Sequence, residues 1–211
     1  MYSNTNDDYG MQFHRTPTTG YIRVLHAVPD APNVDVYAND DLIAADLAFG
    51  ESTDYIAAAP GDYIITVYAA GTQENPVLSN TLTLEENANA TVAAIGTMDN
   101  LQLLAIPDSD LVMEAGTPMV RFVHLSPNAP AVDVTLPTGR LLFSDVAFTQ
   151  RTPYIPAPPR TYTLQVRVAG SPDVVLTVPD VTFEPSMMYT IYAIGLAGDE
   201  PELQALMLTD R

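Results

Sequence analysis

A pattern of fourteen residues occurs twice in this chain, and it limits the fold more than any other feature of the sequence. The first copy runs from Arg23 to Val36 and the second from Arg121 to Val134, so they start 98 positions apart (121 minus 23). Both have the form Arg-x-x-His-x-x-Pro-x-Ala-Pro-x-Val-Asp-Val. Each copy reads as a short strand, a turn bracketed by prolines, and a second strand. The duplication predicts two similar domains in tandem.

Shorter correspondences follow each copy at a nearly constant spacing. Residues 46–49 (Asp-Leu-Ala-Phe) return at 145–148 (Asp-Val-Ala-Phe), and residues 101–104 (Leu-Gln-Leu-Leu) return at 203–206 (Leu-Gln-Ala-Leu). A chain of 211 residues has room for two domains of ordinary size. We therefore expect the following division: a polar N-terminal tail at 1–20, a first domain at 21–107, a linker at 108–118 and a second domain at 119–211.

Short strands separated by turn signals fill both halves, which predicts an all-β fold. The clearest strand is 161–168, where Tyr, Leu and Val alternate with Thr, Gln and Arg. Such alternation is typical of an antiparallel sheet with one buried face. A single helical turn would fit only at 44–51. We predict two tandem antiparallel β-sandwich domains, immunoglobulin- or transthyretin-like. The expected strands are 21–27, 33–38, 41–45, 53–58, 62–69, 76–84, 90–96, 101–106, 119–125, 131–136, 140–143, 152–157, 161–168, 173–178, 188–195 and 202–208.

The charge of the chain excludes several classes of partner. Twenty-six acidic residues face eight basic ones, all of them Arg, and the net charge is −18. This acidity opposes binding to nucleic acid or to anionic lipid. No apolar run approaches the length of about 18 residues that a membrane span needs, so we expect no membrane insertion. The absence of Cys rules out disulfides and thiolate chemistry.

The repeated pattern also resembles a known family. Together with a following Phe and a Gly/Pro-x-x-Tyr element before the alternating strand, it is similar to the DUF4397 family. These bacterial and archaeal domains often occur in tandem, mainly on secreted or surface proteins, and the resemblance implies no biochemical activity. It covers about 21–107 and 119–209. The second copy departs from the first at Ser126, Asn128 and Arg160.

The His, Arg and Asp of the repeat are the first candidates for a site. His26 and His124 lie on apolar strand faces, so we interpret them as hydrogen-bonded core residues that hold the proline turn, not as metal ligands. The Arg of each copy lies on the opposite face of its strand, and the Asp on the strand that follows. We predict a structural Arg–Asp pair in each domain, Arg23 with Asp35 and Arg121 with Asp133.

Acidic turns and surface tyrosines are weaker candidates. Calcium would be the only cofactor, and its oxygens would come from the turns of the first domain, although no EF-hand spacing is present. Those residues are Asp30, Asn33, Asp35, Asn39, Asp40, Asp41 and Asp46. Tyr37, Tyr55 and Tyr154 could stack on sugar rings, but we favour ordinary sandwich roles for them. There is no nucleophile elbow, phosphate loop or dinucleotide fingerprint. We therefore predict that the chain is not an enzyme, and we assign no catalytic, cofactor-binding or metal residue.

These observations favour a non-enzymatic structural or adhesive protein of the cell surface or extracellular space. Residues 1–10 lack the features of a signal peptide, so either a signal was removed or the protein is made in the cytosol and then deposited outside. An alternative is a subunit of a surface fibre, in which the N-terminal tail or an edge strand adds to a neighbour's sheet. A carbohydrate-binding module is a further alternative. The partners would then be further copies of the chain, other surface proteins, or glycans.

Overall fold

The computed structural model describes residues 19–108 and 113–211, and this part of the chain forms sixteen β-strands and no helix. Accordingly, none of its elements is a helix long and apolar enough to cross a membrane. The predicted tail at 1–20 lies almost entirely outside the described residues, and so does the core of the linker at 109–112.

Eight strands belong to each half, and all sixteen predicted strands are present with ends that differ by a few residues. The first eight are β1 (Gly20–His26), β2 (Val34–Ala38), β3 (Asp41–Leu47), β4 (Ile56–Ala58), β5 (Gly61–Ala69), β6 (Leu78–Leu84), β7 (Asn89–Thr97) and β8 (Asn100–Pro107). The second eight are β9 (Met119–His124), β10 (Val132–Thr135), β11 (Leu141–Val146), β12 (Ile155–Pro156), β13 (Thr161–Val168), β14 (Val174–Thr182), β15 (Met188–Ile194) and β16 (Gln204–Asp210).

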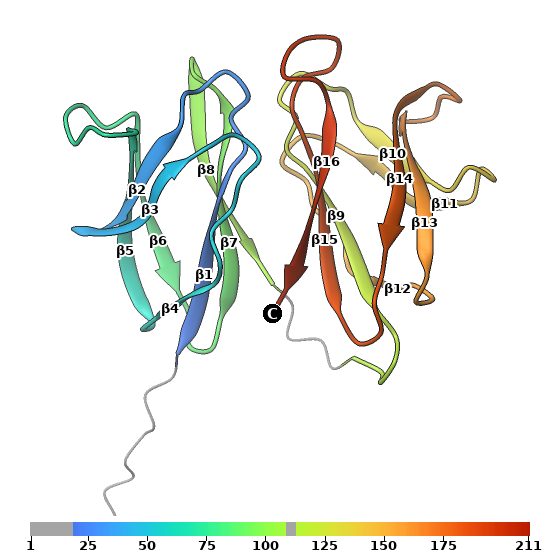
Figure 1. Ribbon diagram of the computed structural model, residues 1–211, viewed down its shortest axis with the longest axis horizontal. Coiled ribbons are helices and arrows are strands. Elements are labelled where there is room, and N and C mark those ends of the chain that lie inside the picture. The colour runs from blue at the N-terminus through green and yellow to red at the C-terminus, as the bar shows by residue number, and fades with distance from the viewer. Residues whose placement is uncertain (1–18, 109–112) are drawn as a thin grey trace, which may run out of the picture.

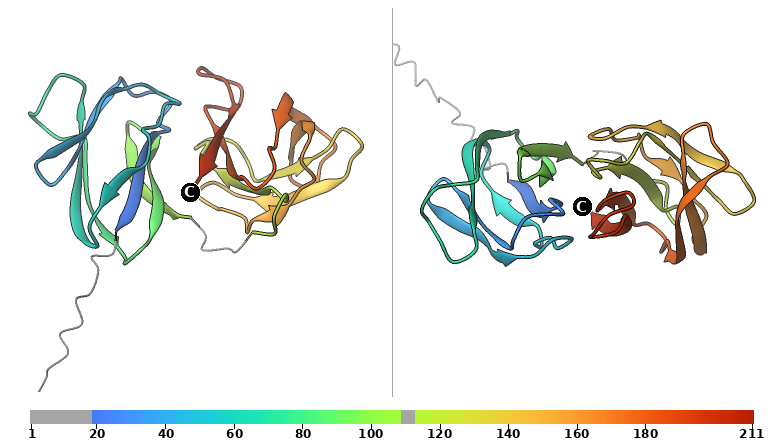
Figure 2. Two further views of the ribbon diagram at one scale, coloured as in Figure 1. Left: turned by 60° about the horizontal axis from the view of Figure 1, so that its bottom comes forward. Right: turned by 90° about the horizontal axis from the view of Figure 1, so that it is seen from above.

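Each half is a sandwich of two four-stranded sheets, as the sequence predicted (Figure 1). In the first domain the sheets have the orders β4-β1-β7-β8 and β3-β2-β5-β6, and in the second β12-β9-β15-β16 and β11-β10-β13-β14. The two domains therefore share one topology. We call the sheets that contain β1 and β9 the inner sheets, because they face the other domain, and the remaining two the outer sheets (Figure 2).

The sheets are mostly antiparallel, as predicted, and each domain also has one parallel pair of strands. Strand β1 pairs in parallel with β7, and β9 pairs in parallel with β15. All other pairs are antiparallel, such as β7 with β8 and β15 with β16. A parallel pair needs a long crossover, and the whole outer sheet supplies it, because β2, β3, β5 and β6 lie between β1 and β7 in the chain.

Alternation along the outer strands builds the core of each sandwich. In β13, Tyr162, Leu164 and Val166 are buried between the sheets, and the residues between them are partly exposed. The helical turn considered at 44–51 is absent from these described residues, since β3 extends to Leu47 and a turn follows. The φ of Asp46 is +51°, and a short polar residue tolerates that conformation well.

A third core lies between the domains. Every residue of β15 is buried, and β9 is buried from Val120 to His124, so both faces of these strands are covered. One face packs within the sandwich and the other against the opposite domain. The buried apolar residues of this interdomain core come from both halves: Leu25, Ala27, Ala93, Ile95, Ile106, Val123, Leu125, Tyr192 and Ile194. The two inner sheets therefore join the domains through a continuous apolar contact.

Candidate functional site

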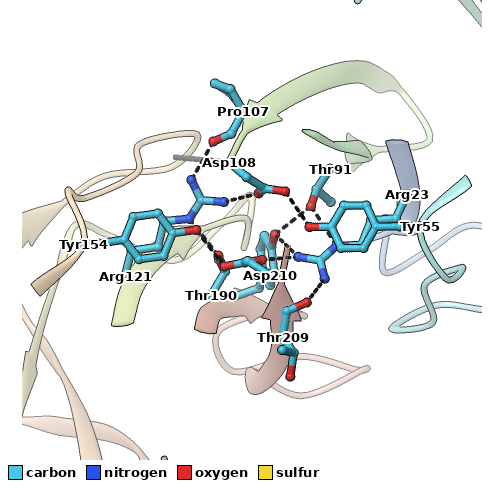
Figure 3. A network of polar contacts seen from close by, with 11 residues as sticks. Arg23, Tyr55, Thr91, Pro107, Asp108, Arg121, Tyr154, Thr190, Thr209 and Asp210 are labelled. Carbon is cyan, nitrogen blue, oxygen red and sulfur yellow. Dashed lines mark hydrogen bonds and ion pairs between the residues drawn. The ribbon is translucent and has the colours of Figure 1, made fainter. Parts of the chain in front are cut away.

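A network of buried polar side chains lies beside the interdomain core (Figure 3). It is built around Arg23 on β1 and Arg121 on β9, which occupy equivalent positions in the two domains. Because the His of each repeat faces its own sandwich core, the Arg three positions before it lies on the opposite face of the strand and faces the other domain. Both arginines are almost fully buried, with 3% and 2% exposure. A buried guanidinium needs partners for all its N–H groups, and the partners identify the site.

Arg23 of the first domain finds its carboxylate in the second. Its Nη2 donates to Oδ1 of Asp210 at 2.5 Å, and its Nη1 donates to the carbonyl of Thr209 at 2.7 Å. Both acceptors lie at the end of β16. Its Nε donates to Oγ1 of Thr91 on the neighbouring strand β7 at 2.8 Å. One guanidinium thus fixes the last strand of the second domain against the first strand of the first.

Arg121 repeats this arrangement in the opposite direction. Its Nη2 donates to Oδ1 of Asp108 at 2.8 Å, and its Nη1 donates to the carbonyl of Pro107 at 2.7 Å. Its Nε donates to Oγ1 of Thr190 at 2.7 Å. Asp108 follows the last strand of the first domain directly, as Asp210 ends the last strand of the second. Each domain therefore supplies the counter-ion of the other domain's arginine.

Two tyrosines connect the two ion pairs. Tyr55 lies with its ring 4.8 Å from the guanidinium of Arg23, and its hydroxyl donates to Oδ2 of Asp108 at 2.5 Å. Tyr154 lies 4.6 Å from the guanidinium of Arg121, and its hydroxyl donates to Oδ2 of Asp210 at 2.7 Å. Cation–π contact and hydrogen bonding therefore close the ion pairs into one ring. We call its six members the interdomain ring: Arg23, Tyr55, Asp108, Arg121, Tyr154 and Asp210.

The ring is not fully symmetric. Tyr192 on β15 donates its hydroxyl to Thr91 at 3.2 Å and lies 3.4 Å from Nη2 of Arg23. The equivalent position on β7 is Ala93, since Thr91 corresponds to Thr190 at the same spacing. A fully buried tyrosine from one domain therefore fills space at the centre of the interface, where the other domain has only a methyl group.

Burial controls the electrostatics of the ring. It raises the pKa of Asp108, against the opposing effects of the hydrogen bond from Tyr55 and the charge of Arg121. It also raises the pKa of Tyr55 and Tyr154, which therefore remain protonated donors. Two cations and two carboxylates balance each other, and their side chains are at most 4% exposed. A substrate cannot reach groups that are covered to this extent, so the ring is suited to holding domains together and not to catalysis.

The predicted pairs of Arg23 with Asp35 and of Arg121 with Asp133 are wrong. Asp35 accepts hydrogen bonds from the backbone N–H groups of Asp46 and Gly71, both at 2.8 Å. Asp133 does the same in the second domain. The physical reason is that β1 and β2 are consecutive in the chain but lie in different sheets, so the aspartate lies on the outer sheet and the arginine on the inner one. These aspartates stabilise turns.

The histidines lie where the sequence predicted. His26 and His124 are 1% and 0% exposed, and each holds the proline turn of its own repeat. Nε2 of His26 lies 3.1 Å from the carbonyl of Pro32, and Nδ1 accepts the N–H of Val28 at 3.3 Å. A carbonyl can only accept, so Nε2 carries the proton and the ring is neutral. Burial accordingly lowers the pKa of both imidazoles.

The residues of the acidic turns considered for calcium make hydrogen bonds within the first domain. Asp30 accepts from the N–H of Met98 at 3.0 Å, and Asn33 donates to the carboxylate of Asp46 at 2.9 Å. Across 19–108 and 113–211 there is no group of three or more His, Cys, Asp or Glu residues that could hold a metal ion.

Of the three tyrosines considered for sugar stacking, only Tyr37 lies on an open sheet face. Tyr55 and Tyr154 belong to the interdomain ring. Tyr37 is partly exposed on the outer sheet of the first domain, where its ring meets that of Tyr68 at 5.6 Å and 88°. The second domain has Thr135 and Arg167 at the equivalent places, joined by a hydrogen bond of 3.1 Å. Of the two outer sheets, only that of the first domain therefore carries this pair of tyrosine rings, Tyr37 and Tyr68.

Sequence reasoning missed Asp108 and Asp210. The repeat carried a signal that would have linked them, because the spacing of 102 that relates residues 101–104 to 203–206 also relates 108 to 210. Extending that match by four residues pairs the two aspartates as equivalent positions. It does not say which arginine each one meets.

The chain belongs to the DUF4397 family, described as a domain of unknown function, whose model matches residues 20–135 and 137–211. This match confirms the resemblance noted in the repeated pattern. The two matched segments meet inside the second sandwich, near the end of β10. No curated protein matches the sequence.

Three solved structures share a distant likeness with the chain. A CBM26 carbohydrate-binding module from Eubacterium rectale, in complex with maltoheptaose, has 10% identity and a TM-score of 0.28, with 92% of this chain and 97% of that one covered. The Bacillus anthracis TIE protein has 10% identity and a TM-score of 0.26 over 83% and 33% of the two chains. A streptococcal virulence factor that binds alpha-glucan has 12% identity and a TM-score of 0.26 over 90% and 97%. Likeness at this level carries no argument about function.

Proposed function

We propose that this protein is a non-enzymatic structural or adhesive module of the cell surface or extracellular space, in which two β-sandwich domains act as one rigid unit. The observation that carries this proposal is the interdomain ring, in which each domain supplies the counter-ion of the other. Domains within a chain usually move relative to one another unless their interface is large and apolar. Here an apolar core and two reciprocal ion pairs share the same interface.

The polar part of the interface supports rigidity in a specific way. Sliding one inner sheet along the other would separate Arg23 from Asp210 and Arg121 from Asp108 together. It would leave four charges buried without partners, and breaking one buried pair by removing a partner already costs about 3–5 kcal/mol. The ring therefore supports a single relative position of the domains, which suits a spacer or a scaffold that presents its outer sheets.

The remaining chemistry is consistent with a role outside catalysis. The residues whose pKa values shift most are covered by the interface, so their perturbation has a structural cause. A net charge of −18 keeps such a protein soluble and repels it from anionic surfaces.

Three measurements test this proposal. Calorimetry of the full chain should show a single unfolding transition for both domains, and small-angle scattering should fit one rigid particle. Two separate transitions, or scattering from domains that move independently, would contradict the rigid unit. Antibody labelling of intact source cells tests the location, and labelling that requires permeabilised cells would contradict it.

A fibre subunit is the second candidate, and the free edges of the outer sheets favour it. Strands β3 and β6 end one outer sheet, and β11 and β14 end the other. An unpaired sheet edge can accept a strand from a neighbouring copy. Negative-stain microscopy of the purified protein distinguishes the candidates, because the fibre requires filaments and the rigid module requires single particles.

Glycan binding is the third candidate, and the pair of Tyr37 and Tyr68 favours it. Exposed aromatic rings on a sheet face can stack on sugars, and Thr66 and Gln73 lie beside them with polar groups. A glycan array tests this candidate. Binding that disappears in a Tyr37→Ala, Tyr68→Ala double variant would support it, and an array without any signal would exclude it.

A further inference from the structure

A groove of about 690 Å³ lies at one end of the second domain. One wall is the start of β14, residues 175–177, and the other is the loop that joins β15 to β16, residues 196–203, which rises at the top of Figure 1. Its volume falls in the range of about 300–1,000 Å³ that is common for ligand sites. Its loop wall precedes the start of β16, whereas Asp210 of the interdomain ring lies at the end of that strand.

The groove combines apolar walls with an acidic rim. Leu176 and Leu203 line it and pack on the sandwich core, and Val175 beside them is 43% exposed. The rim carries Glu200 and Glu202, both exposed. Within 19–108 and 113–211, neither glutamate side chain has a hydrogen bond or an ion pair with another residue. A partner with basic groups next to apolar ones would complement this surface.

One wall of the groove is also the free edge of a sheet. Strand β14 pairs with β13 on one side and is the last strand of its sheet on the other. The edge carries a proline, Pro179, which limits strand addition at that point. The groove lies beside residues 175–177, before this proline, so the backbone there can still pair with an added strand.

Comparison with the equivalent place in the first domain shows that the groove is a specific feature of the second domain. At the equivalent place, β6 contacts β8, and only a small apolar cavity of about 50 Å³ remains. The spacing of the repeat explains the difference. Gly96 corresponds to Gly195 at 99 positions, whereas Leu101 corresponds to Leu203 at 102, so the second domain has three additional residues in this loop (102 minus 99). The longer loop forms one wall of the groove and supplies the acidic rim.

We propose that this groove binds an extended segment of a partner protein, in which basic side chains alternate with apolar ones, and that the segment adds as a strand to the free edge of β14. Its apolar side chains would contact Leu176 and Leu203 on the core-facing side of β14, and its basic ones would meet Glu200 and Glu202. A second copy of this chain is a poor occupant. It has no Lys, its eight Arg are outnumbered by 26 acidic residues, and two copies repel each other.

The test uses the full chain and a short synthetic peptide of alternating Lys and Val, blocked at both ends. Nitrogen-15 NMR of the protein should show shifts of backbone amides at 174–177 and 196–203 as the peptide is added. A Glu–Val peptide of the same length should cause no shift there. A Lys–Val peptide with N-methylated backbone positions should bind weakly as well, because it cannot complete the strand pairing.

Variants distinguish the groove from general attraction to an acidic protein. The double variant Glu200→Gln, Glu202→Gln should lower the association constant about fivefold at low salt, since exposed rim charges contribute modestly. The matched control Glu114→Gln, Glu184→Gln removes two exposed carboxylates that do not line the groove, one in the linker and one in the second domain, and should leave binding unchanged.

Several results would overturn the proposal. It is wrong if millimolar Lys–Val peptide leaves the groove amides unshifted, or if the N-methylated peptide binds equally well. It is also wrong if both double variants weaken binding alike. Shifts of the same amides with rising protein concentration alone would identify a second copy as the occupant. Shifts with calcium but not with peptide would identify a cation site.

Discussion

Arg23 and Asp210 lie 187 positions apart in the sequence, and their side chains form an ion pair of 2.5 Å in the interior of the protein. The pair of Arg121 and Asp108 repeats this relationship with the roles of the domains exchanged. Such reciprocity is the property of an isologous dimer interface, in which one patch meets its own copy. Here both copies of the patch belong to a single chain. The duplicated sequence thus folds into an internal pseudo-dimer.

Removing either aspartate should therefore destabilise the protein strongly. In Asp210→Ala the guanidinium of Arg23 stays buried without its counter-ion, and in Asp108→Ala the same happens to Arg121. Truncating one partner of a buried pair costs about 3–5 kcal/mol of the free energy of unfolding. Urea denaturation measures this loss. The control Asp40→Ala removes an exposed turn carboxylate and should change the stability by no more than about 0.5 kcal/mol.

An apolar replacement of the whole pair sharpens this first prediction. In the double variant Arg23→Met, Asp210→Leu, no charge of the pair remains, so much of the lost stability should return. A double variant as unstable as Asp210→Ala would show that the carboxylate acts through contacts other than its pairing with Arg23.

A double-mutant cycle tests which aspartate couples to Arg121. The structure predicts that Asp133→Ala lowers stability, because the N–H groups of Asp145 and Gly170 lose their acceptor. Its effect should add to that of Arg121→Met within about 0.5 kcal/mol, since they share no partner. In the cycle of Asp108→Ala with Arg121→Met the coupling should exceed about 1 kcal/mol. Coupling to Asp133 and not to Asp108 would contradict the interdomain pairing.

The sequence predicted the strands well because the outer sheets alternate between buried and exposed residues. Strand β13 has one solvent-exposed face, and its alternation of apolar and polar residues, with a period of two, is visible in the sequence. The inner strands lack this alternation. From Val24 to Val28 the first repeat is buried at every position, which is the pattern of a strand covered on both faces. The sequence at 24–28, Val-Leu-His-Ala-Val, is apolar at four of five positions, and such a run indicates a strand with contacts beyond its own sandwich core.

The ion-pair partners of Arg23 and Arg121 could not be predicted from this sequence pattern. Alternation places Arg23 on the face opposite His26, and the structure agrees. Whether that face meets solvent, the next strand or another domain depends on sheet order and domain packing, and neither is encoded locally. Consecutive strands often pair, which favoured Asp35 as the partner. The chain instead places β1 and β2 in different sheets.

Two glycines at equivalent sites should be intolerant of a side chain. At Gly96 the φ is +95°, and an added Cβ would lie 2.2 Å from the carbonyl oxygen of Asn100. At Gly195 the φ is +86°, and the same distance separates the Cβ from the carbonyl oxygen of Glu202. Backbone shifts needed to relieve such contacts cost about 1–3 kcal/mol beyond the penalty of the conformation itself. Gly96→Ala and Gly195→Ala should each lower the free energy of unfolding by at least that amount.

Gly139 provides the matched control for this prediction. Its φ is +83°, yet an added Cβ would meet no atom within 4 Å. Gly139→Ala therefore reports the conformational penalty alone, about 1–2 kcal/mol. Equal losses in all three variants, measured by thermal or urea unfolding, would show that the close carbonyl oxygens are of no consequence.

The buried histidines should make stability depend on pH in a definite direction. Each imidazole is neutral, with Nε2–H donating to a proline carbonyl and Nδ1 accepting a backbone N–H. Protonation of Nδ1 would place its new N–H against the backbone N–H from which Nδ1 now accepts. Burial also lowers the pKa of His26 and His124. The unfolded chain, with a histidine pKa of about 6.5, then binds more protons than the folded chain below that pH.

Stability from the two histidines should accordingly be complete above about pH 6.5 and decline as the pH falls from there towards their folded pKa values. The slope can reach about 1.4 kcal/mol per pH unit for each histidine. Asp108 has the opposite effect on the change of stability with pH. Burial raises its pKa, so at this carboxyl the folded state binds more protons than the unfolded chain as the pH falls. Urea unfolding between pH 8 and 5 measures the slope of stability with pH. His26→Gln and His124→Gln should each reduce that slope even where they lower stability overall, and an unchanged slope in both variants would contradict the neutral, doubly bonded imidazoles.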